Sequence, residues 1–394
     1  MDKTIHHKIL LLNYEFPPLG GGGGRALAQI AKEMAASGHS ITVMTSHFKG
    51  LARVEKIDGY EVIRIPSLRA YQEKCRIHEM IAFLFSSLFF GLFWAYKHRP
   101  KTVIAFFTIP SAPAALAIKK FLGIPFIVSL RGGDVPGFMH QQIGIYHTLT
   151  KPLTRYIWSQ ASSIVANSEG LKNLALQTKK NAQIKIIPNG VDLNFFAGEK
   201  NLSFFEIESR IQKEVSEGSF KILTVGRFSK QKDVATLIQA FHLIKKTVSF
   251  PIELWLVGDG PEKKNLESLV SHLGLNQDVI FFGWLNPQQI KRVYRQAHLF
   301  VLSSLCEGMP NVLLEAMASG LPVIASRVTG NTDLIEDKVN GYLFTPENPE
   351  ELAQVIFSMM NNEKTREKIA QDGLKKVHLL SWDKVARDYL SLCA

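Results

Sequence analysis

The stretch from 297 to 325 constrains the fold more than any other part of the chain. Residues 297–302 form an apolar run with the length of a buried parallel strand. Beyond Pro310, apolar residues recur with helical spacing until Gly320, and a second apolar run follows at 321–325. Strand, loop, helix and strand in this order predict one unit of a parallel α/β sheet, which binds ligands at the carboxyl ends of its strands.

Two glutamates lie at informative positions in this unit. Glu307 falls at the carboxyl end of the first strand, and Glu315 falls two turns into the helix. The amino end of a helix favours an anion such as a diphosphate, and a nearby carboxylate can accept the hydroxyls of a ribose or a sugar. The structural alternative is that Glu307 caps the helix and Glu315 is solvated.

The amino-terminal part of the chain shows the same alternation. Residues 8–13 predict a buried strand, and a turn with five consecutive glycines (20–24), a helix at 26–36 and a strand at 41–44 follow. The glycines permit close backbone approach before a helix, although a plain flexible turn would also use them. The second strand does not end in the acidic residue that holds a ribose in dinucleotide-binding sheets, which disfavours an oxidoreductase.

Charge is distributed unevenly along the chain. Residues 1–195 carry 23 Lys and Arg against 11 Asp and Glu, whereas residues 196–394 carry 23 against 24. A basic half suits an anionic partner, such as a membrane surface, a phosphorylated acceptor or nucleic acid, although extra lysines also serve solubility alone. Nucleic acid is the weakest of these partners, because no nucleic-acid-binding motif occurs.

Three cysteines without a Cys-x-x-Cys pair, and an amino terminus without a signal-peptide pattern, predict a cytoplasmic protein. Residues 80–96 are uncharged, include five Phe and predict a helix at the short limit of a membrane span. A strand-like run at 103–107 follows, and a span would separate it from the sheet that contains 62–65. We therefore expect a crossover helix. Its hydrophobic surface and the basic segment 97–101 leave open a peripheral contact with the inner face of the plasma membrane.

The second domain is expected to begin with a strand at 220–226. Arg227 and Lys232 follow in a loop before a helix at 234–246. Two cations in a loop are ordinarily solvated, but cations at a strand end can also stabilise a departing diphosphate without a metal. Further strands at 253–257 and 279–284 are expected to line the same edge.

The sequence Glu307-x7-Glu315, with Gly320 at the end of its helix, resembles the motif of the family 4 retaining glycosyltransferases (group 1 glycosyltransferases). The resemblance implies an α/β protein with the GT-B fold, in which two doubly wound Rossmann-like domains face each other across a cleft. The implied divisions are an acceptor-side domain (1–198), a boundary excursion (199–218), a nucleotide-sugar-binding domain (219–375) and a carboxyl-terminal helix that crosses back to the first domain (376–394).

The resemblance also implies a reaction, the transfer of a hexosyl group from a UDP- or GDP-linked donor to a glycan or lipid-linked acceptor, without a metal or a cofactor. Glu315 would hold the ribose and Glu307 the donor sugar, while Arg227 and Lys232 would hold the diphosphate. The other donor-binding residues implied by the resemblance are Gly258, Gly283, Gly308, Met309, Pro310, Asn311 and Val312.

In the first domain, Gly21 and Gly22 match the turn that the family places near the acceptor and the diphosphate. Arg131 stands where the family commonly has a histidine. It is expected to face a phosphate or an acidic acceptor, or else to form an ion pair with Asp134. A catalytically silent nucleotide-sugar-binding protein of the same fold is the alternative function. The sequence does not define the sugar, the base or the acceptor.

Overall fold

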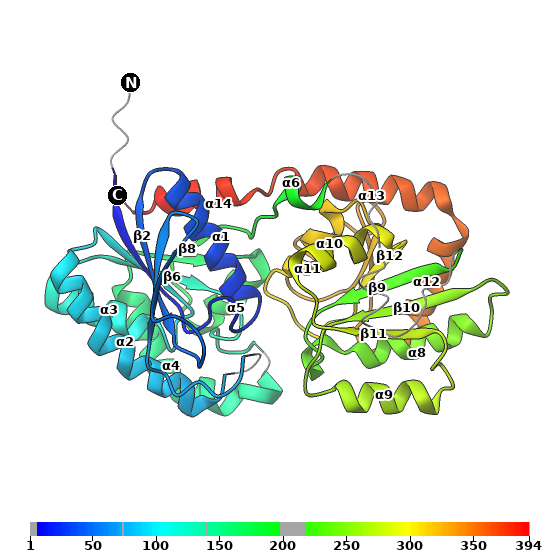
Figure 1. Ribbon diagram of the computed structural model, residues 1–394, viewed down its shortest axis with the longest axis horizontal. Coiled ribbons are helices and arrows are strands. Elements are labelled where there is room, and N and C mark those ends of the chain that lie inside the picture. Colours follow the sequence, from blue (N-terminus) through cyan, green and yellow to red (C-terminus); the bar gives the residue numbers. More distant parts are fainter. Residues whose placement is uncertain (1–5, 73–74, 139, 198–217, 394) are drawn as a thin grey trace, which may run out of the picture. The chain divides into compact units, whose positions relative to one another are not determined.

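The computed structural model describes residues 6–72, 75–138, 140–197 and 218–393. The chain folds into two compact units, one formed by 1–190 with 382–394 and the other by 191–381. Each unit is an α/β structure built on its own sheet (Figure 1). The boundary excursion predicted at 199–218 lies, apart from Gly218, outside the described residues.

The first unit is built on a sheet with the strand order β3-β4-β2-β1-β5-β6-β7-β8, in which only the pair β3–β4 is antiparallel among the described residues. Its elements are β1 (Lys8–Leu12), α1 (Gly22–Ala36), β2 (Ser40–Ser46), β3 (Val54–Ile57), β4 (Tyr60–Ile65), α2 (Ile77–His98), β5 (Thr102–Phe106), α3 (Ala112–Leu122), β6 (Phe126–Leu130), α4 (His140–Gln160), β7 (Ser163–Ala166), α5 (Glu169–Thr178), β8 (Ile184–Ile186) and α14 (Trp382–Leu390).

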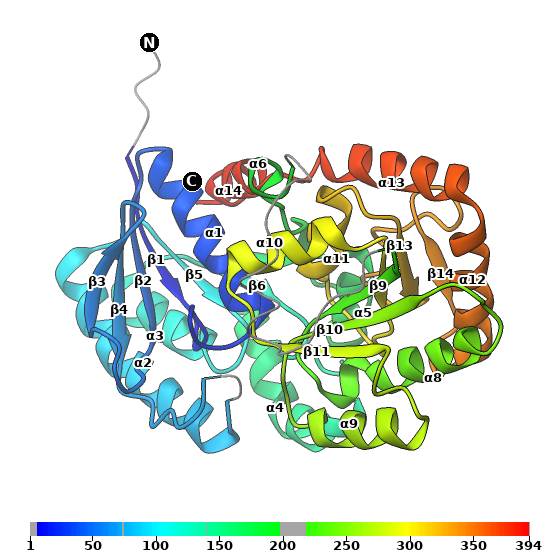
Figure 2. The same ribbon diagram turned by 45° about the vertical axis from the view of Figure 1, so that its right-hand side comes forward.

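The helices of the first unit divide between the two faces of its sheet. The connection from β1 through α1 to β2 runs in one direction across the sheet, and the connections through α2, α3 and α4 run in the other. Because such crossovers are right-handed, opposite directions place helices on opposite faces. Figures 1 and 2 show α2, α3 and α4 on one face, with α1 and α14 on the other.

The second unit is built on a parallel sheet with the order β11-β10-β9-β12-β13-β14. Its elements are α6 (Leu193–Phe196), β9 (Phe220–Val225), η1 (Lys230–Lys232), α8 (Val234–Lys245), β10 (Ile252–Val257), α9 (Lys263–His272), β11 (Val279–Gly283), α10 (Pro287–Gln296), β12 (Leu299–Leu302), α11 (Asn311–Ala318), β13 (Val323–Ser326), β14 (Tyr342–Phe344), α12 (Pro349–Asn361) and α13 (Glu363–Val377).

Burial explains why the central strands are almost continuously apolar. β10 is buried along its whole length, since helices cover both faces of a parallel sheet. Its only charged residue, Glu253, accepts a hydrogen bond from Trp255 Nε1 at 2.8 Å. Two apolar clusters, one on each side of this sheet, contain residues of β9 and β10, and a third cluster lies between the sheet of the first unit and the helices α1 and α14.

Local structure differs from the sequence-based prediction at three places. Helix α1 begins at Gly22, so that three of the five glycines are helical and only Gly20 and Gly21 belong to the turn. The edge strand β3 pairs antiparallel with β4, and its half-exposed pattern gives little apolar signal. Helix α4 was not predicted, because its exposed face is apolar and its sequence contains Pro152.

Candidate active site

The site in the second unit lies at the point where the strand order reverses. β9 and β12 are neighbours in the sheet, but β9 leads to β10 on one side and β12 leads to β13 on the other. The loops that leave these two strands therefore meet at their carboxyl ends. Open α/β sheets bind ligands at such a switch point.

Hydrogen bonds join these two loops. Gln231 Nε2 donates to the carbonyl of Cys306 at 2.8 Å, and the Leu305 N–H donates to the carbonyl of Gln231, also at 2.8 Å. Ser303 Oγ donates to the carbonyls of Lys232 at 3.1 Å and Asp233 at 2.8 Å. The backbone of the cationic loop is thus held against the backbone that carries Glu307.

Lys232 and Glu307, both predicted site residues, form an ion pair within this frame. Lys232 Nζ lies 2.5 Å from Glu307 Oε1, and the two side chains are 19% and 8% exposed. A pair that is largely shielded from water interacts more strongly than a surface pair. Lys232 still has two N–H donors to offer an anion, because an ammonium group carries three.

Arg227, the second predicted cation, lies at the start of the same loop. Its Nε is buried and has no hydrogen-bond partner among the described residues. A buried guanidinium donor without an acceptor is costly unless a ligand supplies one. An anion bound beside Arg227 would provide that acceptor.

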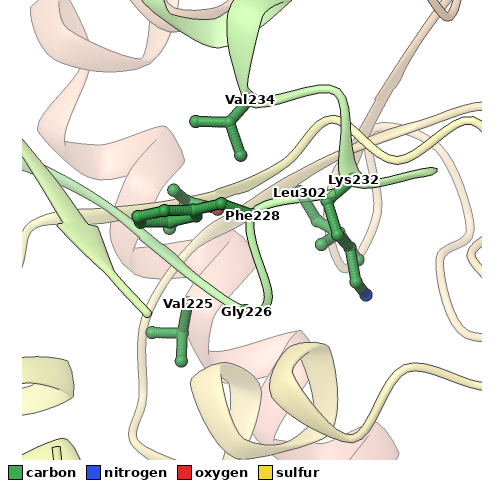
Figure 3. A pocket seen from close by; sticks show the side chains of 7 residues that line it. Val225, Gly226, Phe228, Lys232, Val234 and Leu302 are labelled. Atoms are coloured by element: carbon green, nitrogen blue, oxygen red, sulfur yellow. The ribbon is translucent and has the colours of Figure 1, made fainter. Parts of the chain in front are cut away.

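A small recess lies beneath this loop. It is lined by Thr224, Val225, Gly226, Phe228, Lys232, Val234 and Leu302. Figure 3 shows the Lys232 side chain extending away from the apolar side chains of Phe228 and Val234. The apolar residues therefore form the base that fixes the loop, while the ammonium group stays at its rim.

Glu315 is held by a different residue, Tyr294 of α10. The Tyr294 hydroxyl donates to Glu315 Oε2 at 3.0 Å and lies 3.2 Å from the Val312 carbonyl. Tyr294 is fully buried, so it fixes the rotamer of a half-buried carboxylate. Sequence reasoning missed this positioning residue, because a tyrosine in an amphipathic helix gives no signal beyond core packing.

The loop from 308 to 312 forms the amino end of α11. Pro310 is the N-cap, and no side chain caps the helix there. Gly308, Met309 and Pro310 are buried, whereas Asn311 and Val312 are half-buried in the first turn. The positive end of the helix dipole thus lies in the loop that carries Glu307.

The predicted glycines Gly258 and Gly283 serve close backbone packing. A Cβ on Gly258 would lie 1.9 Å from the Gly226 carbonyl oxygen, and the Gly258 N–H donates to the Gly283 carbonyl at 2.9 Å. The carboxyl ends of β9, β10 and β11 are therefore held together without side chains between them. Trp284, which follows β11, is 40% exposed.

A glycine that sequence reasoning did not assign to the site also packs against Glu307. A Cβ on Gly330 would lie 2.4 Å from the Gly308 carbonyl oxygen and 2.7 Å from that of Glu307. The next residue, Asn331, is buried and donates through Nδ2 to the Ser326 carbonyl at 2.9 Å. The turn after β13 therefore packs directly against the backbone of the Glu307 loop.

The first unit has a switch point of its own between β1 and β5. The glycine-rich turn follows β1, with Gly21 as the N-cap of α1 and Gly22 as its first residue. A Cβ on Gly23 would lie 2.7 Å from the ring of Phe107, which follows β5. Gly23 thus allows the amino end of α1 to pack directly on the loop of the neighbouring strand, whereas a Cβ on Gly21 would meet nothing within 4 Å.

Arg131, at the end of β6, does not place its guanidinium on Asp134. Nη1 donates to Asn189 Oδ1 at 2.8 Å, Nη2 lies 3.4 Å from the Tyr389 hydroxyl, and the guanidinium stacks 4.6 Å above the Phe106 ring. Asp134 instead accepts from the backbone N–H of Arg131 at 2.9 Å.

Electrostatics distinguish this half-buried cation from Lys232. Burial lowers the pKa of Arg131, and the hydrogen-bond partners of its guanidinium are the neutral side chains of Asn189 and Tyr389. Burial also raises the pKa of Asp134, against the opposing effect of N–H and O–H donors from Arg131 and Thr108. Nε of Arg131 is buried and has no hydrogen-bond partner among the described residues.

No group of three or more His, Cys, Asp and Glu in the described part of the chain is arranged to hold a metal ion.

Comparison with known proteins assigns a family to these two units. Residues 20–195 match the family model described as Glycosyltransferase Family 4, and residues 205–376 match the model described as Glycosyl transferases group 1. Together the two models span most of the chain. The protein belongs to the group 1 glycosyltransferases of family 4.

Individual relatives are distant but cover most of the chain. Alpha-monoglucosyldiacylglycerol synthase of Streptococcus pneumoniae is 25% identical over 94% of this chain and 84% of its own length. Sucrose-phosphate synthase of Thermosynechococcus elongatus superposes with a TM-score of 0.84 over 98% of both chains, at 20% identity. HepE of Anabaena in complex with UDP and glucose superposes with a TM-score of 0.76 over 98% of this chain and 99% of its own, also at 20% identity. At this identity the solved structures show the fold alone, which is GT-B.

Proposed function

We propose that this glycosyltransferase moves a hexose from a UDP- or GDP-linked donor to a glycan or lipid-linked acceptor, with retention at the anomeric carbon and without a metal. The observation that carries the proposal is the Lys232–Glu307 pair at the switch point of the second sheet, with Arg227 in the same loop. The two cations at this edge match the negative charge of a diphosphate. The carboxylate matches the positive charge that develops on the anomeric carbon during transfer.

The cations would act on the leaving group. As the bond between the anomeric carbon and the diphosphate breaks, negative charge grows on the phosphate oxygens, and fixed donors stabilise it without reorganisation. Arg227 presents a planar set of N–H donors that suits phosphate oxygens, and Lys232 adds a compact charge. The amides of Met309 and Asn311 at the amino end of α11 would assist.

The two glutamates would act on different parts of the donor. Glu315, oriented by Tyr294, would accept hydroxyls of the ribose. Glu307 would lie beside the transferred sugar, where its charge stabilises the positive charge that develops on the anomeric carbon. Lys232 connects these events, because phosphate binding draws its ammonium group from Glu307 toward the donor.

Retention would follow if the acceptor hydroxyl attacks from the face that the diphosphate leaves. The acceptor oxygen then bonds to the anomeric carbon, the bond from that carbon to the phosphate oxygen breaks, and the hydroxyl proton passes to the released diphosphate. In the first unit, Gly21, Gly22 and Arg131 would hold an anionic group of the acceptor, since the guanidinium of Arg131 has neutral partners and an unused Nε donor.

A role in glycolipid or polysaccharide synthesis, on the cytoplasmic face of the plasma membrane, is supported by the basic first half of the chain. The similarity to alpha-monoglucosyldiacylglycerol synthase of Streptococcus pneumoniae agrees with a lipid-linked acceptor, and the similarity to HepE, which was solved in complex with UDP and glucose, agrees with a uridine donor.

Thermal shift with UDP, GDP, ADP and CMP, followed by the corresponding nucleotide-sugars, tests this function. We expect UDP or GDP, and one sugar derivative of it, to raise the melting temperature, and we expect slow release of the free diphosphate from that derivative. Failure of every nucleotide to bind would contradict the proposal. Binding without any cleavage or transfer, with acceptor-containing membrane extract present, would identify a silent nucleotide-sugar-binding protein instead.

A further inference from the structure

Helix α2 presents a continuous apolar stripe to solvent. Its exposed residues recur about every four positions, which places them on one helix face: Ile77, Ile81, Phe85, Phe89, Phe93 and Tyr96. Phe85, Phe89 and Phe93 are 65%, 69% and 64% exposed. The opposite face of α2, which includes Phe83 and Gly91, is buried. Three phenylalanines in a row with most of their surface in water indicate a contact that the isolated chain does not make.

A second stripe of the same kind lies on α4. Ile145, Leu149, Leu153 and Tyr156 follow the same four-residue spacing and are all exposed, Ile145 and Leu149 by 82% and 76%. Phe121, near the end of α3, is 75% exposed. Helices α2, α3 and α4 lie on one face of the first sheet (Figures 1 and 2). The Lys120 ammonium group of α3 lies 5.7 Å from the ring centre of Tyr156 in α4, so these two helices are in contact there. We call this surface the three-helix face.

The charges around the three-helix face all have one sign. Residues 80–168, which contain most of α2 and the whole of α3 and α4, carry eight Lys and Arg and one acidic residue, Asp134. That carboxylate is buried and accepts hydrogen bonds from Thr108 and the Arg131 N–H. Five of the cations stand in or just beyond the last turns of α2 and α3: Lys97, Arg99, Lys101, Lys119 and Lys120. Arg155 is exposed in the second half of α4. Aromatic and aliphatic groups beside cations, without an exposed carboxylate, complement an anionic membrane surface.

A membrane span would not fit this arrangement. Helix α2 is long and apolar enough to cross a bilayer, the only such helix among the described residues. However, it connects β4 and β5 of one sheet and packs against α3 through its buried face. It also starts with a buried carboxylate, because Glu79 accepts the N–H groups of Ala70 and Arg76 at 3.0 and 2.8 Å. Only its outer stripe is available to lipid.

We propose that the three-helix face docks the protein on an anionic bilayer, with α2 and α4 lying along the surface and their phenylalanine, leucine and isoleucine side chains in the headgroup region. Gln72, five residues before α2 in the sequence, lies against the glycine-rich turn, since the Gly20 N–H donates to the Gln72 carbonyl at 2.9 Å. A lipid-linked acceptor would therefore reach the turn along the amino end of α2. This second statement rests on the proposed function, whereas the docking itself does not.

Flotation of the full chain with vesicles tests the proposal. We expect binding to vesicles of phosphatidylcholine with 30 mol% phosphatidylglycerol, at least tenfold weaker binding to pure phosphatidylcholine, and a marked loss of binding in high salt. The variants F85S/F89S/F93S and I145S/L149S should each reduce the bound fraction about tenfold or more. A matched control, F357S/L379S, removes exposed apolar residues of the second unit and should leave binding unchanged.

Three results would overturn the docking proposal. They are the absence of a lipid-bound fraction at low salt, equal losses in the control and test variants, and a concentration-dependent dimer that F85S/F89S/F93S converts to a monomer, since a dimer would mean that a second copy covers the face. The thermal shift with UDP and GDP should persist in every variant. Vesicle binding without a nucleotide-induced shift would leave docking intact and contradict the proposed function.

Discussion

Both units have a switch point in their sheet with a cation beside it, but the two cations differ in their partners. In the second unit, Lys232 is paired with the carboxylate of Glu307 at 2.5 Å. In the first unit, the guanidinium of Arg131 is stacked on Phe106 and hydrogen-bonded to the neutral side chains of Asn189 and Tyr389. A pair that is already neutral can exchange partners when a ligand arrives. A cation with neutral partners attracts an anion from the start.

This difference agrees with the proposed roles of the two units, donor binding in the second and acceptor binding in the first. In the second unit, hydrogen bonds to the loop backbones hold the two loops together, so the loops can stay in place while the Lys232 side chain exchanges partners. In the first unit, Gly23 lets the amino end of α1 pack on Phe107, and Arg131 supplies positive charge nearby. Substitutions that change one charge at a time test this division.

Loss of Lys232 should have the largest effect. Under the proposed function, Lys232→Ala removes a donor to the departing diphosphate and leaves Glu307 without its partner, so we expect turnover to fall by about 10²–10³-fold. Release of UDP or GDP from the nucleotide-sugar measures it. Lys230→Ala is the matched control, because Lys230 is exposed in the same loop. A similar loss in both variants would show that the loop needs general positive charge and not the paired ammonium group.

Arg131→Ala should affect the acceptor and spare the donor. We expect a fall of about 10- to 100-fold in transfer of labelled sugar to membrane lipid extract, as for a lost hydrogen bond to a charged group. The UDP- or GDP-induced thermal shift should be unchanged. Arg131→Lys should recover part of the transfer. Unaltered transfer in Arg131→Ala would mean that the guanidinium only fastens α14 and the Asn189 segment to the sheet.

In the first unit, the buried carboxylate of Glu79 contributes to the stability of the fold. Burial raises the pKa of Glu79, but hydrogen bonds from the N–H groups of Arg76 and Ala70 outweigh it, and the net pKa is lowered. A lowered carboxyl pKa stabilises the fold above the ordinary pKa, and this stabilisation disappears as the pH falls through the folded-state pKa.

Glu79→Gln should therefore lower the free energy of unfolding by about 1–2 kcal/mol at pH 7. The difference from the original protein should disappear in acid, which urea unfolding at several pH values would show. Glu169→Gln, at the exposed start of α5, should change stability much less. A difference for Glu79→Gln that is the same at pH 7 and below pH 4 would contradict the charge-based explanation.

Tyr294→Phe should have the smallest effect. It removes the hydroxyl that fixes Glu315, without changing the charge of that carboxylate. We expect weaker binding of both the free diphosphate and the nucleotide-sugar by about 0.5–1.5 kcal/mol, as for an ordinary hydrogen bond. Calorimetry measures both. A loss confined to the nucleotide-sugar would place Glu315 near the transferred sugar and not the ribose.

Sequence patterns predicted the two parallel sheets because buried strands are apolar runs of recognisable length, as 297–302 and 220–226 are. They also predicted Lys232 and Glu307 in one site, since both residues follow strands that the resemblance places side by side. They did not predict Tyr294 as the partner of Glu315 or the neutral partners of Arg131, because these contacts join residues 21, 58 and 258 positions apart. The stripe on α4 was also missed, since apolar residues on both faces and Pro152 hid the helix itself.

We propose that Glu307 and Glu315 serve different parts of one donor, and this division of roles can be measured on two variants. Calorimetry with the free diphosphate is run beside transfer kinetics for Glu307→Gln and Glu315→Gln. Glu315→Gln should weaken the diphosphate and the nucleotide-sugar alike, by about 1.5–3 kcal/mol. Glu307→Gln should leave diphosphate affinity nearly intact and reduce mainly kcat. Equal loss of diphosphate affinity in both variants would contradict the division of roles, and unchanged binding and turnover in both would contradict the enzyme site itself.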